Sequence, residues 1–145
     1  MAVESRGQAV WEGDLLGGSG TVTLDSGLAS DLPVTWAART EAPAGKTTPE
    51  ELIAGAHAAC FSMALSNILA QAGNPPERLE VGATATFDKK GQGWGITTID
   101  LEVRGTVPGM DAAEFEKHAE TAKDSCPVSN ALKGNVALGV KASLA

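Results

Sequence analysis

The sequence predicts a single α+β domain over residues 1–145, in which two unlike helices separate runs of strands. Its helix-like and strand-like segments follow the order β-β-β-α-β-β-α-β. Strands that occur in runs, rather than singly between helices, are typical of α+β folds and not of doubly wound parallel sheets. With 145 residues the chain is long enough to bury one hydrophobic core without disulfide bonds.

The first forty residues predict three strands. Weak alternation ending in glycine marks Gln8–Gly13, and β-branched residues mark Thr21–Leu24. Alternating side chains also predict a strand over Pro33–Thr40, which places Arg39 at a strand end. The following segment, residues 41–47, is rich in Pro, Gly and small residues and is expected to be a mobile surface loop.

The segment Thr48–Gly73 predicts a long helix around which the fold is organised. Thr48 and Glu51 have the spacing of a capping box, and Gly73 with the prolines after it supplies the stop. No charged side chain lies between Leu52 and Ala70. A helix that is apolar nearly all round is either buried in protein or inserted in a membrane.

Composition favours the buried alternative for this helix. The uncharged run approaches the ~20 apolar residues that cross a bilayer. However, it consists largely of Ala, Gly and Ser, it includes His57 and Asn67, and acidic, strand-like segments flank it. We therefore predict a central core helix and no membrane partner.

Two alternating segments after this helix, Arg78–Asp88 and Trp94–Val107, predict an antiparallel hairpin with one solvated face. A second helix begins at Asp111, and its apolar stripe at helical spacing predicts that it covers a sheet from outside. The chain closes with a short helical turn after Cys126 and a strand over Val136–Leu144.

Charge and cysteine content limit the function classes. The net charge of −7 argues against nucleic-acid binding, which needs a basic surface for the phosphates. The first residues, Met1–Gln8, contain charge and no apolar run, so we expect no signal peptide. Two cysteines are too few for a secreted disulfide framework, so a reducing cytoplasm is the expected location.

The two cysteines, Cys60 and Cys126, are the candidate reactive groups. Their spacing forms no zinc motif, and the alternative for Cys60 is a small buried core residue without chemistry. Cys126 precedes Pro127 and a helical turn, where the helix dipole favours a thiolate, although nearby Asp124 opposes this effect.

A thiolate at Cys60 needs a nearby cation. His57 lies three residues earlier on the same helical face and could act as its base, although a core histidine bonded to a backbone carbonyl is the alternative. Arg39 is the second candidate, and an ordinary surface arginine is its alternative. Glu50 lies about 15 Å from Cys60 along the helix axis, too far for direct contact.

Four segments together resemble the OsmC/Ohr family of osmotically inducible and organic hydroperoxide resistance proteins: GQAVWEGDL, PEELIAGAHAACFSMAL, VPGMDAAEFEKHAETAK and SCPVSNALKGNV. The likeness covers nearly the whole chain from about Gly7 onward. The opening segment and the arginine before the long helix resemble the OsmC branch of the family.

The resemblance implies a cysteine-based thiol peroxidase without a bound cofactor. Cys60 matches the peroxidatic cysteine and Cys126 the resolving cysteine, while Glu50 matches the family glutamate. Arg39 matches the arginine of the OsmC branch, with Arg6 as its nearest substitute. His57 matches no catalytic position. The family also implies a fold of antiparallel sheets wrapped on a central buried helix. It further implies an intertwined homodimer with active sites at the subunit interface.

In the implied reaction, the Cys60 thiolate attacks the peroxide oxygen. Arg39 stabilises the thiolate and the leaving alkoxide, and Glu50 holds Arg39 in position. The Cys60 sulfenic acid then condenses with Cys126, and an external dithiol of the lipoyl type reduces the disulfide. The implied role is defence against oxidative or osmotic stress.

Apolar neighbours of the cysteines lead us to expect an apolar pocket formed by Phe61, Met63 and Val128. Such a pocket would favour alkyl or fatty-acid hydroperoxides over hydrogen peroxide. Two other functions stay open: a non-catalytic carrier of a small apolar ligand, and a redox sensor that signals through its disulfide. A carrier would keep both cysteines inert, whereas a sensor would share the chemistry and turn over poorly.

Overall fold

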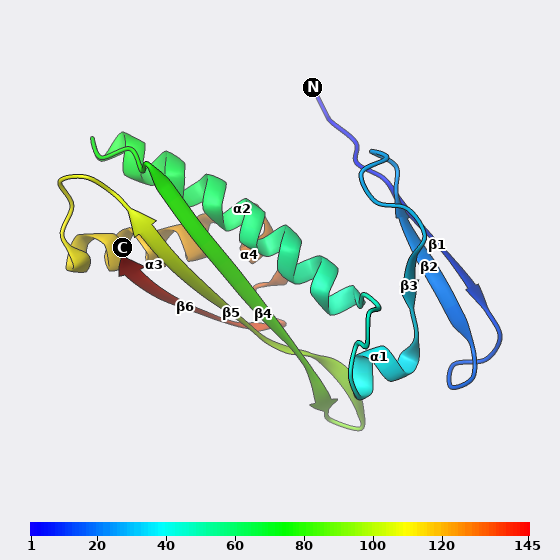
Figure 1. Ribbon diagram of the computed structural model, residues 1–145. Helices are drawn as coiled ribbons and strands as arrows, with labels where there is room; N and C mark the ends of the chain where they lie inside the picture. The colour runs from blue at the N-terminus through cyan, green and yellow to red at the C-terminus, as the bar shows by residue number, and fades with distance from the viewer. The chain divides into compact units, whose positions relative to one another are not determined.

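The computed structural model describes residues 1–145, and these divide into two compact units, Met1–Pro49 and Glu50–Ala145. The first unit holds a small sheet and a short helix, and the second holds the long helix, another sheet and two further helices (Figure 1). This composition confirms the α+β class. The single domain expected from the sequence stays a prediction.

Strands dominate the first unit, as the sequence predicts. Strands β1 (Gly7–Glu12), β2 (Ser19–Leu24) and β3 (Leu32–Val34) form one antiparallel sheet in sequence order. The backbone N–H of Thr47 donates a hydrogen bond to the carbonyl of Pro33 at 3.0 Å. The last residue of the loop at 41–47 is therefore hydrogen-bonded to β3.

The predicted strand over Pro33–Thr40 is mostly wrong. Residues Trp36–Thr40 form the short helix α1, because the extended Thr35 accepts a hydrogen bond from the N–H of Ala38 at 3.2 Å through its hydroxyl. Such an N-cap starts a helix, and the two alanines that follow are good helix formers. Arg39 therefore lies in the last turn of a helix and not at a strand end.

The long helix α2 (Pro49–Gln71) confirms the predicted element and its stop. Gly73 adopts a φ of 89°, and its N–H donates to the carbonyl of Ala70 at 3.0 Å. The N–H of Asn74 donates to the carbonyl of Leu69 at 2.9 Å. These two bonds form a Schellman motif, which ends a helix where glycine can take the left-handed conformation.

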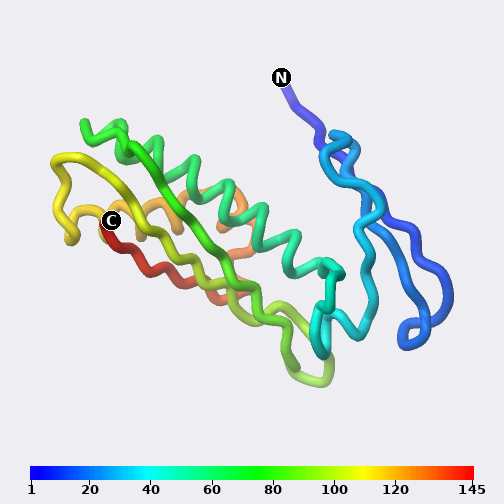
Figure 2. The backbone as a smooth tube through the Cα atoms, in the orientation of Figure 1, coloured from blue at the N-terminus to red at the C-terminus, as the bar shows by residue number.

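The sheet of the second unit is mixed. Strands β4 (Arg78–Lys90) and β5 (Gly93–Thr106) form the predicted antiparallel hairpin. Strand β6 (Ala137–Leu144) pairs with β5 in parallel, so the expectation of antiparallel sheets is wrong for this strand. Helices α3 (Ala112–Ser125) and α4 (Pro127–Leu132) make the crossover that a parallel pair requires, as the path of the chain in Figure 2 shows.

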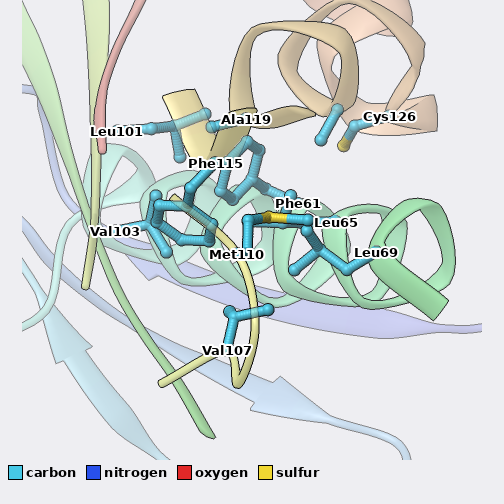
Figure 3. Close-up of a cluster of buried hydrophobic side chains, with 11 residues drawn as sticks. Phe61, Leu65, Leu69, Leu101, Val103, Val107, Met110, Phe115, Ala119 and Cys126 are labelled. Atoms are coloured by element: carbon cyan, nitrogen blue, oxygen red, sulfur yellow. The ribbon is translucent and has the colours of Figure 1, made fainter. Parts of the chain in front are cut away.

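Helices α2 and α3 pack on one face of this sheet and share a single core. The side chain of Asp111 marks the start of α3, because its carboxylate accepts a hydrogen bond from the backbone N–H of Glu114 at 2.9 Å. Figure 3 shows the core residues, which include Phe61, Leu65 and Leu69 of α2, Leu101 and Val103 of β5, and Phe115 and Ala119 of α3.

Only one face of α2 is buried in the single chain. The stripe of Phe61, Leu65 and Leu69 has no exposed surface, whereas Met63 is 68% exposed and Asn67 is also exposed. By length and composition α2 is a helix that could cross a membrane. Its packing in the core confirms the predicted core helix for this stripe, and the opposite face of α2 is exposed in the single chain.

We expect the substitution Gly105→Ala in β5 to destabilise the second unit. A Cβ at Gly105 would lie 2.5 Å from Cζ of Phe115, whose side chain is fully buried. Overpacking of this kind lowers the free energy of unfolding by about 1–3 kcal/mol. Urea denaturation followed by circular dichroism measures the change.

Gly82→Ala in β4 is the matched control, because a Cβ at Gly82 meets no atom within 4 Å. Its unfolding midpoint should stay near that of the wild type. The double variant Gly105→Ala/Phe115→Leu should recover part of the lost stability, since the smaller side chain removes the clash. Equal losses for Gly105→Ala and Gly82→Ala would contradict the role given to Phe115.

Candidate active site

The two cysteines meet where α2 passes the junction between α3 and α4. Cys60 lies in the middle of α2. Cys126 is both the C-cap of α3 and the N-cap of α4. The two cysteines are 3.0 Å apart, with their thiols in hydrogen-bonding contact, and both are free. Cys126 is fully buried and Cys60 is partly exposed, so reactants can reach Cys60 more easily.

Local groups affect the two thiols in opposite directions. Burial opposes ionisation of Cys126, yet its pKa is lowered, because the Cys60 thiol, the Ser129 hydroxyl and the first N–H groups of α4 face its sulfur. Burial and the contact with Cys126 raise the pKa of Cys60, against the opposing effect of the Val128 N–H. Cys126 therefore lies at the N-terminus of α4, as the sequence predicts, and the N–H groups there favour its thiolate.

His57 has a partner that the sequence did not reveal. Its Nε2 lies 2.7 Å from Oγ of Ser129, and both side chains are buried. Its Nδ1 has no hydrogen-bond partner, and burial lowers the pKa of the imidazole. The expected bond to a backbone carbonyl is thus replaced by a bond to a hydroxyl. The sequence did offer one indication that Ser129 belongs to the site. Ser129 follows Cys126 by three residues, a spacing that places both on one face of a helical turn.

Arg39 belongs to the first unit. Its guanidinium carbon lies 5.6 Å from the centre of the Trp36 ring, a distance typical of a cation–π contact. It lines a cavity of about 310 Å³ together with the apolar side chains of Trp11, Leu15, Val34, Trp36 and Pro49. The first unit therefore places a guanidinium group at the wall of an apolar cavity.

Glu50 lies in the first turn of α2 and is 5% exposed. Because α2 is continuous, Glu50 and Cys60 are separated by about 15 Å along its axis, as expected. The substitute arginine, Arg6, is largely exposed and forms an ion pair with Glu4 at 2.6 Å. The pairing of Arg39 with Glu50 and Cys60 would join the two units, and it stays a prediction.

The expected apolar pocket of Phe61, Met63 and Val128 does not form. Phe61 is fully buried in the core, Met63 is on the exposed face of α2, and Val128 packs against the core from α4. The reason is their helical phase, since neighbours in sequence point to different sides of a helix. The apolar cavity beside Arg39 is built from other residues.

Comparison with known proteins places the chain in a family. The model of the OsmC-like protein family matches residues 42–141. The chain is 45% identical to the Peroxiredoxin OsmC of Escherichia coli (strain K12) over 138 residues, which is 95% of this chain and 96% of that protein. It is 38% identical to an Organic hydroperoxide resistance protein of Xanthomonas axonopodis pv. citri (strain 306) over 93 residues, 62% of each chain.

The fold agrees with the sequence comparison. The crystal structure of the Organic Hydroperoxide Resistance Protein OhrB of Bacillus subtilis matches with a TM-score of 0.75 and 25% identity, covering 95% of this chain and 98% of that chain. The sequence match, the fold and the two adjacent cysteines agree with one another. The chain therefore belongs to the family of OsmC-like proteins, as the four sequence segments indicated.

Proposed function

We propose that this protein is a thiol-dependent peroxidase that reduces organic hydroperoxides to alcohols in defence against oxidative or osmotic stress. The observation that carries the proposal is the 3.0 Å approach of Cys60 and Cys126 in a chain of this family. The names of its relatives, Peroxiredoxin OsmC and Organic hydroperoxide resistance protein, support the reaction and the substrate class.

The reaction begins when the Cys60 thiolate attacks one oxygen of the hydroperoxide. The O–O bond breaks, the alkoxide leaves and takes up a proton, and Cys60 becomes a sulfenic acid. The Arg39 guanidinium stabilises the thiolate and the leaving alkoxide, and the Glu50 carboxylate holds the guanidinium. Cys126 then displaces water from the sulfenic acid to form the Cys60–Cys126 disulfide.

Two features of the structure support a role for Arg39. Burial and the contact with Cys126 raise the pKa of Cys60, and a nearby cation such as a guanidinium would favour its thiolate. The apolar cavity beside Arg39 suits the alkyl part of an organic hydroperoxide. The proposed substrates are therefore alkyl or fatty-acid hydroperoxides.

The protein returns to its dithiol form by exchange with an external dithiol, for which a lipoyl-type reductant is proposed. We also propose that the protein acts in the cytoplasm as a homodimer. The exposed face of α2 supports the dimer, since it carries Ala59 and Met63 and no charged side chain between Leu52 and Ala70. A second copy of the chain would cover this face with apolar surface.

The first test compares the wild type with Cys60→Ser and Cys126→Ser. With dihydrolipoamide as reductant, we expect the wild type to consume cumene hydroperoxide faster than hydrogen peroxide. Cys60→Ser should abolish consumption because it removes the nucleophile, whereas Cys126→Ser should retain a single turnover that ends at the sulfenic acid. A coupled assay for peroxide loss measures all three proteins.

Faster consumption of hydrogen peroxide would contradict the substrate class. The proposed enzyme would be contradicted by a lack of turnover with either peroxide, or by full activity of Cys60→Ser. If neither peroxide is turned over, binding of an apolar dye in the cavity beside Arg39 would favour the carrier function instead.

Arg39→Lys should lower kcat/KM for cumene hydroperoxide about tenfold or more, because lysine keeps the charge but cannot donate two parallel hydrogen bonds as a guanidinium does. Arg39→Leu should lower it by about 10²–10³, the typical effect of removing a group that stabilises a developing oxyanion. Arg6→Leu is the control and should keep wild-type kinetics. The opposite ranking of Arg39→Leu and Arg6→Leu would transfer the role to Arg6.

The dimer is tested by sedimentation velocity. We expect the wild type to sediment at twice the mass of the chain and Met63→Glu to shift it toward the monomer, because the substitution places a charge on the exposed face of α2. Thr121→Glu, which adds the same charge on the exposed surface of α3, should leave the mass unchanged. A monomeric wild type would contradict the proposed assembly.

A further inference from the structure

His57 and Ser129 form a second contact beside the cysteine pair. His57 and Cys60 are three residues apart on α2, and Cys126 and Ser129 are three residues apart at the start of α4. Cys60 approaches Cys126 to 3.0 Å, while Nε2 of His57 approaches Oγ of Ser129 to 2.7 Å. The turn that carries Cys126 is therefore held against α2 at two neighbouring points.

The direction of the His57 hydrogen bond follows from burial. His57 has no exposed surface, Ser129 is 1% exposed, and Nδ1 of His57 has no partner. A neutral imidazole carries one N–H, and an unpaired buried N–H costs more than an unpaired acceptor nitrogen. The proton therefore belongs on Nε2, from which it is donated to Oγ of Ser129.

This arrangement leaves the hydroxyl hydrogen of Ser129 available for another acceptor. Cys126 is the group on the same face of the turn, and the Ser129 hydroxyl acts with the α4 N–H groups to lower the pKa of Cys126 against the effect of burial. The resulting chain runs from the His57 N–H to the Ser129 oxygen, and from the Ser129 O–H to the Cys126 sulfur. Such a chain orients one donor toward a thiolate.

We propose that His57 and Ser129 are positioning residues that hold the Cys126 thiolate ready to attack the Cys60 sulfenic acid. The inference rests on the proposed peroxidase function and goes beyond it. It assigns these residues to disulfide formation and not to the reaction with peroxide. Both side chains are buried, and in this proposal they act through Cys126 and not on the substrate.

The step that they assist is balanced. The Cys126 thiolate attacks the sulfur of the Cys60 sulfenic acid, the S–S bond forms and the S–O bond breaks. Hydroxide leaves and becomes water with the proton that Cys126 lost on ionisation. The Cys60 sulfur is reduced and the Cys126 sulfur is oxidised, so no further oxidant is needed.

The experiment measures two steps separately in a single turnover: formation of the Cys60 sulfenic acid, and formation of the Cys60–Cys126 disulfide. Reduced full-length protein is mixed with one equivalent of cumene hydroperoxide and quenched at intervals with an alkylating reagent or with dimedone. Mass spectrometry then measures free thiol, trapped Cys60 sulfenic acid and disulfide. Ser129→Ala and His57→Leu should slow disulfide formation about tenfold, the effect of losing a hydrogen bond to a charged group. They should slow sulfenic acid formation much less, so that trapped sulfenic acid accumulates.

Two further variants exclude a merely structural effect. His57→Gln keeps an N–H donor near the position of Nε2 and should restore most of the rate of disulfide formation. Leu65→Ala removes a fully buried side chain from the same stripe of α2 without touching the His57–Ser129 contact. It should lower stability but leave the ratio of the two rates as in the wild type.

The outcomes are distinguishable. Equal slowing of both steps in Ser129→Ala, wild-type disulfide formation in His57→Leu, or the same selective loss in Leu65→Ala would each overturn the inference while leaving the peroxidase intact. A wild-type protein that forms no Cys60 sulfenic acid would overturn the proposed function itself.

Discussion

The contact between α2 and the α3–α4 junction is the interaction on which the candidate site depends. It brings together two cysteines that are far apart in sequence, and a hydrophobic core holds it in place. Phe61, Leu65 and Leu69 fix α2 on the sheet, and each such burial contributes about 1.5–3 kcal/mol. A pair of adjacent thiols therefore exists because an apolar helix packs against a sheet, and the chemistry follows from that packing.

Electrostatics near this contact assign different properties to the two sulfurs. The buried Cys126 lies at the N-cap of α4, where N–H groups and a hydroxyl favour its thiolate. Cys60 is more accessible, yet burial and its neighbour disfavour its ionisation. In the proposed peroxidase, a cation from outside the cysteine pair would favour the Cys60 thiolate. Arg39 is the cation proposed for this role, and within the first unit it lines an apolar cavity.

Much of this could be predicted because the signals are local. The stop at Gly73 and the absence of charge indicated the extent of α2, and alternation gave the β4–β5 hairpin. A local pattern failed at Pro33–Thr40, where a few alternating residues suit a strand or a helical turn equally well. The Thr35 hydroxyl decided in favour of a helix, and with it the element that carries Arg39.

By itself the sequence determined the α+β class, the long helix, the family and the two cysteines, since each depends on residue identity or on near neighbours. Only the tertiary structure decided that β6 runs parallel to β5, that Phe61 belongs to the core and that His57 bonds Ser129. These are contacts between residues distant in the chain. They depend on which apolar surfaces of distant segments pack together, and a short sequence pattern does not determine this packing.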